Sequence, residues 1–178
     1  MSNFPKNANH GQAVFVIFCI RQAGVSSLTA SLTAEQFVRL LQENANVCES
    51  AVREMGGSIV NIISECIFAA WNTEDSFLSD VNYVDIACDL IRRLSAKRDA
   101  QKSVVSISIT KGQCVFEREG EAYKSVVGMP WNRSAILSEK YTSESQSSLI
   151  IEESLMPFVG ARKVEQVAPS VWKIGLDK

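Results

Sequence analysis

The stretch Ala13-Val-Phe-Val-Ile-Phe-Cys-Ile20 is an unbroken apolar run rich in β-branched and aromatic residues. A strand with one face in water alternates apolar and polar side chains, whereas a strand buried on both faces reads as a continuous hydrophobic run. The run therefore predicts a central strand with both faces buried.

A long helix is expected after this strand. Thr33 and Gln36 match a capping box, in which each side chain satisfies a backbone amide at the helix start. Apolar residues then recur at helical spacing as far as Met55, and Gly56 supplies the left-handed conformation that commonly ends a helix. We expect an amphipathic helix over residues 33–55.

Short apolar runs separated by turn residues predict the rest of the sheet. Residues 58–63 and 66–71 are separated only by Ser64-Glu65 and are expected to form a hairpin. The remaining expected elements are a helix over 84–94, strands over 104–110 and 113–116 joined by a turn at Lys111-Gly112, a strand over 122–127, a helix starting near Pro130, strands over 149–151 and 171–174, and a helical turn over 155–159.

The predicted order of elements is β-α-β-β-α-β-β followed by β-α-β-β. This order is typical of an α+β fold with a ferredoxin-like split βαβ core and a C-terminal β-α-β extension. We expect the helices to pack on one face of a mostly antiparallel sheet. Residues 1–11 lack periodicity and are expected to form a disordered leader, whereas 12–178 are expected to form a single domain.

Composition excludes several classes of function. The chain has 18 Lys and Arg against 20 Asp and Glu, so it lacks the basic field that holds nucleic acid. Its apolar runs stop short of the roughly 18 residues that a membrane helix needs, so no membrane insertion is expected. The one histidine, His10, lies in the predicted leader, which excludes Ser-His or Cys-His catalysis in the folded body. Five dispersed cysteines without metal-ligand spacing indicate buried thiols in a reducing, cytoplasmic compartment.

The succession of elements over about residues 13–174 resembles the class III nucleotide cyclase homology domain. The resemblance is carried by the apolar first strand, the long helix ending in Gly56-Gly57, the hairpin, Gly112, the segment from Tyr123 to Gly128, and Asn132. It implies the cyclase fold, and it implies a site formed between two cyclase domains. The expected partner is therefore a second copy of this chain or another cyclase domain.

The resemblance also implies a depleted metal site. Two aspartates of the family hold two metal ions that stabilise the attacking and leaving oxygens. The first falls on Arg21 or on Ile20, depending on the alignment, and residues 11–34 contain no Asp or Glu. The second falls on Glu65, which is the one candidate metal ligand. Its alternative role is that of an exposed turn residue.

The nucleotide-reading positions are altered as well. The lysine that reads the base falls on Asn61, its partner falls on Met129, and the transition-state arginine falls on Ile136. The ribose asparagine is kept as Asn132, whose alternative role is to cap the helix backbone. The loop after the first strand contains Ser26 and Ser27. Their hydroxyl groups could bind phosphate, or they could belong to an ordinary polar loop.

We expect Arg21 to pair with Glu65, because the two family aspartates converge on the same metal ions. An arginine–carboxylate ion pair would fill the vacated metal position. The sequence thus predicts a cyclase-like domain without cyclase activity that serves as a dimerisation or regulatory partner in cyclic-nucleotide signalling, with no cofactor. The alternatives are an active adenylate or guanylate cyclase that uses Mg²⁺ or Mn²⁺ in an atypical or partner-completed site, and a module that binds ATP or GTP without a metal.

Overall fold

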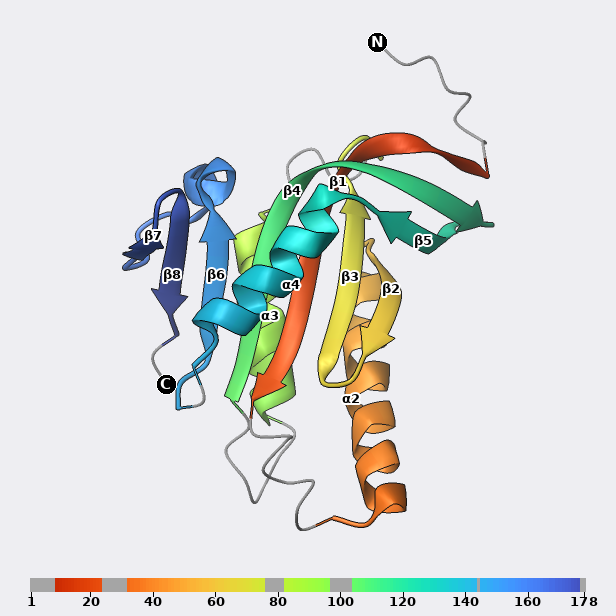
Figure 1. Cartoon of the computed structure of the whole chain (residues 1–178), viewed down its shortest axis with the longest axis horizontal. Coiled ribbons are helices and arrows are strands. Elements are labelled where there is room, and N and C mark those ends of the chain that lie inside the picture. The colour runs from red at the N-terminus through yellow and green to blue at the C-terminus, as the bar shows by residue number, and fades with distance from the viewer. Residues whose placement is uncertain (1–8, 24–31, 76–81, 97–103, 144, 177–178) are drawn as a thin grey trace.

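The computed structural model describes residues 9–23, 32–75, 82–96, 104–143 and 145–176. Within these ranges one sheet of eight strands is flanked by three α-helices and a short 3₁₀ helix (Figure 1). In chain order the elements are β1 (His10–Ala23), α2 (Ala34–Glu54), β2 (Ser58–Ile63), β3 (Cys66–Asn72), α3 (Tyr83–Ala96), β4 (Val104–Glu119), β5 (Ala122–Val127), α4 (Met129–Tyr141), β6 (Ser148–Glu152), η1 (Glu153–Phe158), β7 (Glu165–Ala168) and β8 (Val171–Gly175).

The strands are arranged in the order β2-β3-β1-β4-β6-β8-β7, and β5 pairs with β4 off this path. All the pairings are antiparallel except that of β4 with β6. The predicted α+β class with a mostly antiparallel sheet is therefore confirmed. None of the helices in the described ranges is long and apolar enough to cross a membrane.

Strand β1 occupies the middle of the sheet, as its apolar run predicts. It pairs with β3 along one edge and with β4 along the other. Val16, Phe18 and Ile20 point into one core, whereas Phe15 and Ile17 belong to a second core on the opposite face. All five side chains are fully buried.

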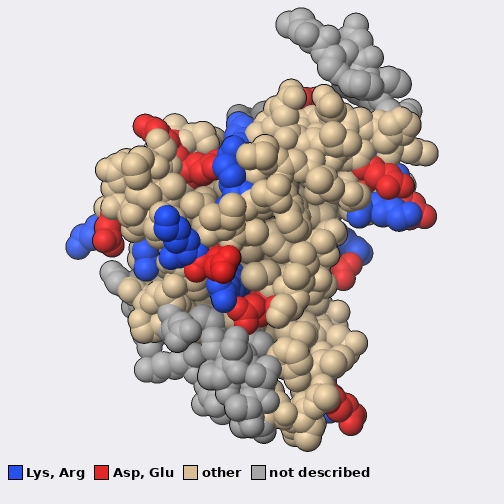
Figure 2. Space-filling view, in the orientation of Figure 1, with Lys and Arg blue, Asp and Glu red and all other residues tan. Residues whose placement is uncertain are grey.

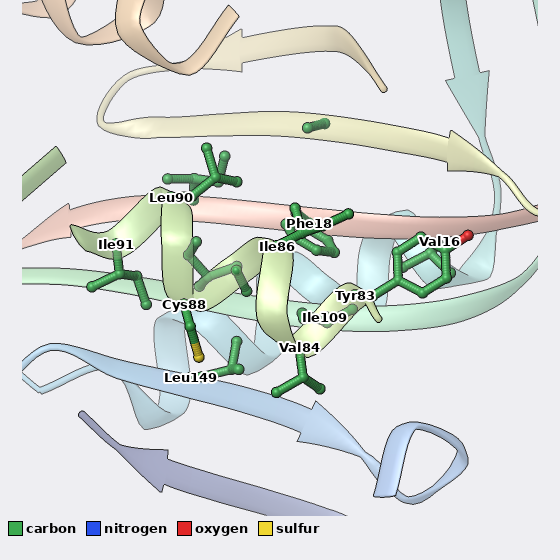
Figure 3. Packing of buried hydrophobic residues seen from close by; sticks show 14 of the residues in the cluster. Val16, Phe18, Tyr83, Val84, Ile86, Cys88, Leu90, Ile91, Ile109 and Leu149 are labelled. Carbon is green, nitrogen blue, oxygen red and sulfur yellow. The ribbon is translucent and has the colours of Figure 1, made fainter. Parts of the chain in front are cut away.

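Helices cover both faces of this sheet. Helices α2 and α3 contribute to the larger core, where residues of α3 pack onto the strands (Figure 3). Helix α4 crosses the other face, with Trp131 and Ala135 packed against the smaller core (Figure 1). The expectation that all helices share one face is wrong for α4, because an amphipathic pattern marks the buried side of a helix but not the sheet face that it covers.

Strand β4 runs without interruption through Lys111-Gly112, where the sequence predicts a turn. It stays extended because β1 pairs with it from Val104 to Glu117, and Gly112 lies opposite Phe15. Gly112 instead allows α4 to pack close to β4, because a Cβ atom at this position would lie 2.9 Å from Cγ of Pro130 in α4. The chain reverses later, at Gly120, whose φ of +64° suits glycine.

Two segments extend the predicted sheet. His10 and Gly11, expected in the leader, belong to β1 and pair with Glu117 and Phe116, whereas residues 1–8 lie outside the described part of the chain. Strand β7 was not predicted, because an edge strand with mixed polar and small side chains has no clear alternation.

The local signals around α2 are confirmed. Thr33 Oγ1 accepts from the Gln36 amide at 3.3 Å, and Gln36 Oε1 accepts from the Thr33 amide at 2.8 Å. Gly56 follows the helix with a φ of +75°. The predicted hairpin of β2 and β3 also forms, and Ser64 takes the left-handed conformation in its turn, with a φ of +52°.

Gly57 gives the first testable prediction, because a Cβ atom there would lie 2.4 Å from Cε2 of the fully buried Trp71. Trp71 is anchored by a 3.0 Å hydrogen bond from its indole nitrogen to the Met55 carbonyl. We expect Gly57→Ala to lower the free energy of unfolding by about 1–3 kcal/mol, the usual cost of overpacking a core.

Urea denaturation measures this effect, with Gly175→Ala as the control. A Cβ atom at Gly175 meets its nearest atom at 3.5 Å, so that variant should change stability by less than about 0.5 kcal/mol. Equal stability of the two variants would show that the Trp71 contact does not constrain this turn.

Candidate functional site

An ion pair joins the end of β1 to the turn between β2 and β3. Arg21 lies opposite Cys66 in the pairing of β1 with β3, so its side chain is brought next to Glu65. Arg21 Nε donates to Glu65 Oε1 at 2.7 Å, and Nη2 lies 2.6 Å from the same oxygen. The predicted pairing of Arg21 with Glu65 is therefore present.

The ion pair is shielded from solvent. The side chains of Arg21 and Glu65 are 27% and 14% exposed. Glu65 is thus not the solvent-exposed turn residue of the alternative interpretation. Its carboxylate is held at the end of the sheet by a guanidinium from the neighbouring strand.

Helix α4 carries three of the other predicted site residues on its solvent side. Met129 is 66% exposed, Ile136 is 58% exposed, and Asn132 is also exposed. The helix begins at Met129 with Gly128 as its N-cap. Asn132 therefore lies inside the first turn and does not have the alternative role of capping the helix. These three side chains therefore share an outward surface of α4.

Asn61 is exposed on β2, next to an irregularity in its pairing with β3. Its Oδ1 accepts a 2.8 Å hydrogen bond from the amide of Ile62, so the side chain is engaged with its own strand. Ser26 and Ser27 lie outside the described residues. The described ranges contain no group of three or more His, Cys, Asp and Glu side chains placed to hold a metal ion.

Hydroxyl groups on β4 determine how α4 sits on the sheet. Ser108 Oγ donates to the Ser134 carbonyl and Thr110 Oγ1 donates to the Pro130 carbonyl, both at 2.6 Å. Neither Ser108 nor Thr110 was predicted to have a role. The signal was present, since Ser and Thr alternate with Val and Ile along β4 and must therefore share one face.

Arg133 of α4 forms an ion pair with Glu152, the last residue of β6. Its Nε and Nη2 reach the two carboxylate oxygens of Glu152 at 2.6 and 3.0 Å. Over the face that α4 crosses, basic and acidic side chains of the described residues lie close to one another (Figure 2). The guanidinium of Arg133 is therefore committed to a structural contact, although it lies next to Asn132 in the sequence.

The second prediction concerns the ion pair itself. Arg21→Asp would bring two carboxylates together, and we expect the free energy of unfolding to fall by about 2 kcal/mol, less than the 3–5 kcal/mol for a fully buried pair because both side chains keep some solvent contact. Urea denaturation checks this value.

The exposed pair of Arg39 and Glu35 provides the control, because their side chains are 70% and 88% exposed. Arg39→Asp should cost less than about 1 kcal/mol. The charge-swapped double variant Arg21→Glu with Glu65→Arg should recover part of the loss. A neutral effect of Arg21→Asp would contradict a stabilising role for the ion pair.

No protein-family model and no curated protein matches the chain. Several solved structures do match it. The adenylyl cyclase CyaB of P. aeruginosa superimposes with a TM-score of 0.73 at 14% identity, covering 96% of this chain and 97% of that one. The dimeric guanylyl cyclase domain of RhoGC from the fungus Blastocladiella emersonii gives 0.73 at 11% identity, with 94% and 97% covered. The guanylate cyclase domain of RhGC from Catenaria anguillulae, bound to GTP, gives 0.73 at 10% identity, with 94% and 98% covered. The chain therefore has the fold of the adenylyl and guanylyl cyclase domains.

Proposed function

We propose that this chain is a cyclase-like domain that has lost nucleotide cyclase activity and acts as a dimerisation or regulatory partner in cyclic-nucleotide signalling. The ion pair of Arg21 and Glu65 carries the proposal. It lies where the resemblance to the cyclases implies two metal-binding aspartates, and it joins the same two segments of chain that would bring those aspartates together.

The residues present do not fit a pair of divalent cations. If the first aspartate position falls on Arg21, its guanidinium is a fixed positive charge that repels a nearby cation instead of coordinating it. If the position falls on Ile20, the side chain has no atom that could bind a cation. At about 4 Å and an effective dielectric constant near 20, each pair of unit charges contributes about 4 kcal/mol. Glu65 would also have to leave Arg21 before it could serve a metal ion.

The position of the transition-state arginine supports the same conclusion. Ile136 is exposed and has no charge to offer a phosphate group. Loss of one such electrostatic contact typically costs about 3–4 kcal/mol of transition-state stabilisation. Arg133 does not replace it, because both of its hydrogen-bonded nitrogens are occupied by Glu152.

The outward surface of α4 supports a role in association. Met129 and Ile136 are seven residues apart, so they lie two helical turns apart on the same side of the helix, with Asn132 between them. Large apolar side chains at this exposure gain free energy when a partner covers them. One of the superimposed cyclase domains is described as dimeric, and we propose a second cyclase-like domain as the partner here.

Two observations favour the alternative of an active cyclase. Glu65 keeps a carboxylate at one metal position, and Asn132 keeps an exposed amide at the ribose position. A partner chain would then have to supply the missing acidic and basic groups. Binding of ATP or GTP without turnover is the third outcome that an assay should distinguish.

The third prediction is that the purified chain produces no cyclic nucleotide from ATP or GTP with excess Mn²⁺. Chromatographic detection of cyclic AMP and cyclic GMP checks this, with circular dichroism to show that the protein is folded. The P. aeruginosa cyclase, assayed in parallel with ATP, serves as the positive control. Turnover that Glu65→Ala abolishes would refute the inactive function and make Glu65 a metal ligand.

The fourth prediction is that the chain self-associates through the outward surface of α4. We expect Ile136→Asp to weaken the dimer at least tenfold in sedimentation equilibrium, because a charge would be buried at the contact. Val38→Asp is the matched control, since Val38 is 50% exposed on α2 and should leave association unchanged. A chain that stays monomeric at every concentration would exclude self-pairing.

A further inference from the structure

Strand β2 forms an open edge of the sheet. It is the terminal strand in the order of the sheet, and within the described ranges it pairs with β3 alone. Strand β5 lies beside its beginning, where the Tyr123 amide donates to Ser58 Oγ at 3.4 Å. The second half of β2, residues 61–63, lies beyond that contact, and all three residues are exposed.

The composition of β2 is that of a segment prone to self-association. Residues 58–63 read Ser-Ile-Val-Asn-Ile-Ile, without a charge, a proline or a glycine. Six-residue segments with high β-propensity and low charge stack readily with identical segments of other chains. Ile62 and Ile63 are 48% and 47% exposed, so their apolar side chains are accessible at the open edge. Natural proteins protect edge strands of this kind against pairing with another chain.

The strand pairing determines which backbone groups of β2 face outward. Opposite residues on antiparallel strands alternate between pairs that exchange hydrogen bonds and pairs whose amides and carbonyls point away from each other. The Thr73 amide, just after β3, donates to the Val14 carbonyl of β1 at 2.9 Å, and the pairing of β1 with β3 is regular. Alternate residues counted back from Thr73, which include Ile67, therefore face β1. Ile62 lies opposite Ile67, so its own amide and carbonyl face the open edge.

The Asn61 side chain occupies this outward amide. Asn61 Oδ1 accepts a hydrogen bond from the Ile62 amide at 2.8 Å. A strand that paired with this edge would need the same amide as a donor. The register of β2 on β3 also shifts between Ile59 and Asn61, and an irregularity of this kind interrupts the regular spacing that an added strand would follow.

We propose that Asn61 protects the open edge of β2 against pairing with the same edge of a second copy of this chain. Its side chain takes up the donor that such pairing requires, and it is the one polar side chain between Ile59 and Ile63. The contact is autoinhibitory, because it blocks an association that the rest of the segment favours. This inference does not depend on the proposed loss of cyclase activity, and it concerns a different surface from that of α4.

The fifth prediction is that Asn61→Val makes the full chain assemble through its β2 edge. The substitution is introduced together with Ile136→Asp, so that association through α4 does not contribute. We expect assembly that binds thioflavin T to proceed at least five times faster than in Ile136→Asp alone, because valine removes the acceptor and completes an apolar segment. Thioflavin T fluorescence and light scattering of the folded protein measure the rate.

A second exposed strand residue provides the matched control. Glu117 of β4 is exposed, but its strand is paired on both edges at this point, with His10 of β1 and with Ser125 of β5. Glu117→Val in the same Ile136→Asp chain should therefore assemble no faster than that chain. Equal assembly of the Glu117→Val and Asn61→Val chains would overturn the proposal, because added apolar surface alone would then explain the effect.

Hydrogen exchange tests the contact itself without any assembly. Asn61→Ala removes the acceptor, so the Ile62 amide, observed by NMR in dilute protein, should exchange at least three times faster than in the parent chain. Asn61→Asp keeps an acceptor oxygen at this position and should retain the slow exchange. Unchanged exchange of the Ile62 amide in Asn61→Ala would contradict the mechanism.

Discussion

The double-sided burial of β1 is the constraint on which the rest of this structure depends. The strand is paired along both edges and has apolar side chains on both faces, so each face needs its own cover. Helices α2 and α3 provide the cover on one side and α4 provides it on the other (Figure 1). The same pairings set the register that places Arg21 opposite Cys66, and hence beside Glu65.

This register explains why charge at the sheet end has to be balanced. The end of β1 and the turn between β2 and β3 lie close together whatever residues they carry, because β1 is paired with β3 and β3 begins at that turn. Two acidic residues there would need cations to offset their repulsion, whereas an arginine and a glutamate balance each other. Arg21 and Glu65 thus balance each other's charge at this end of the sheet.

Helix α4 links the cyclase fold to the proposed association. Hydroxyls of Ser108 and Thr110 bind its backbone from below, while Arg133 anchors it to Glu152. These contacts fix the rotation of the helix and leave Met129 and Ile136 in solvent. The outward surface of α4 thus carries two large apolar side chains that a protein contact could cover.

Short stretches of sequence by themselves determined most elements of this protein. They include the strand over residues 13–20 with both faces apolar, the capping box at Thr33, the helix end at Gly56 and the lack of Asp or Glu in residues 11–34. The proximity of Arg21 and Glu65 could be anticipated only through the resemblance to the cyclases. Tertiary structure alone decided the face that α4 covers and the extended path through Lys111-Gly112. Each of these depends on which strands pair and in what register, and a one-residue change of register would send every side chain to the other face of the sheet.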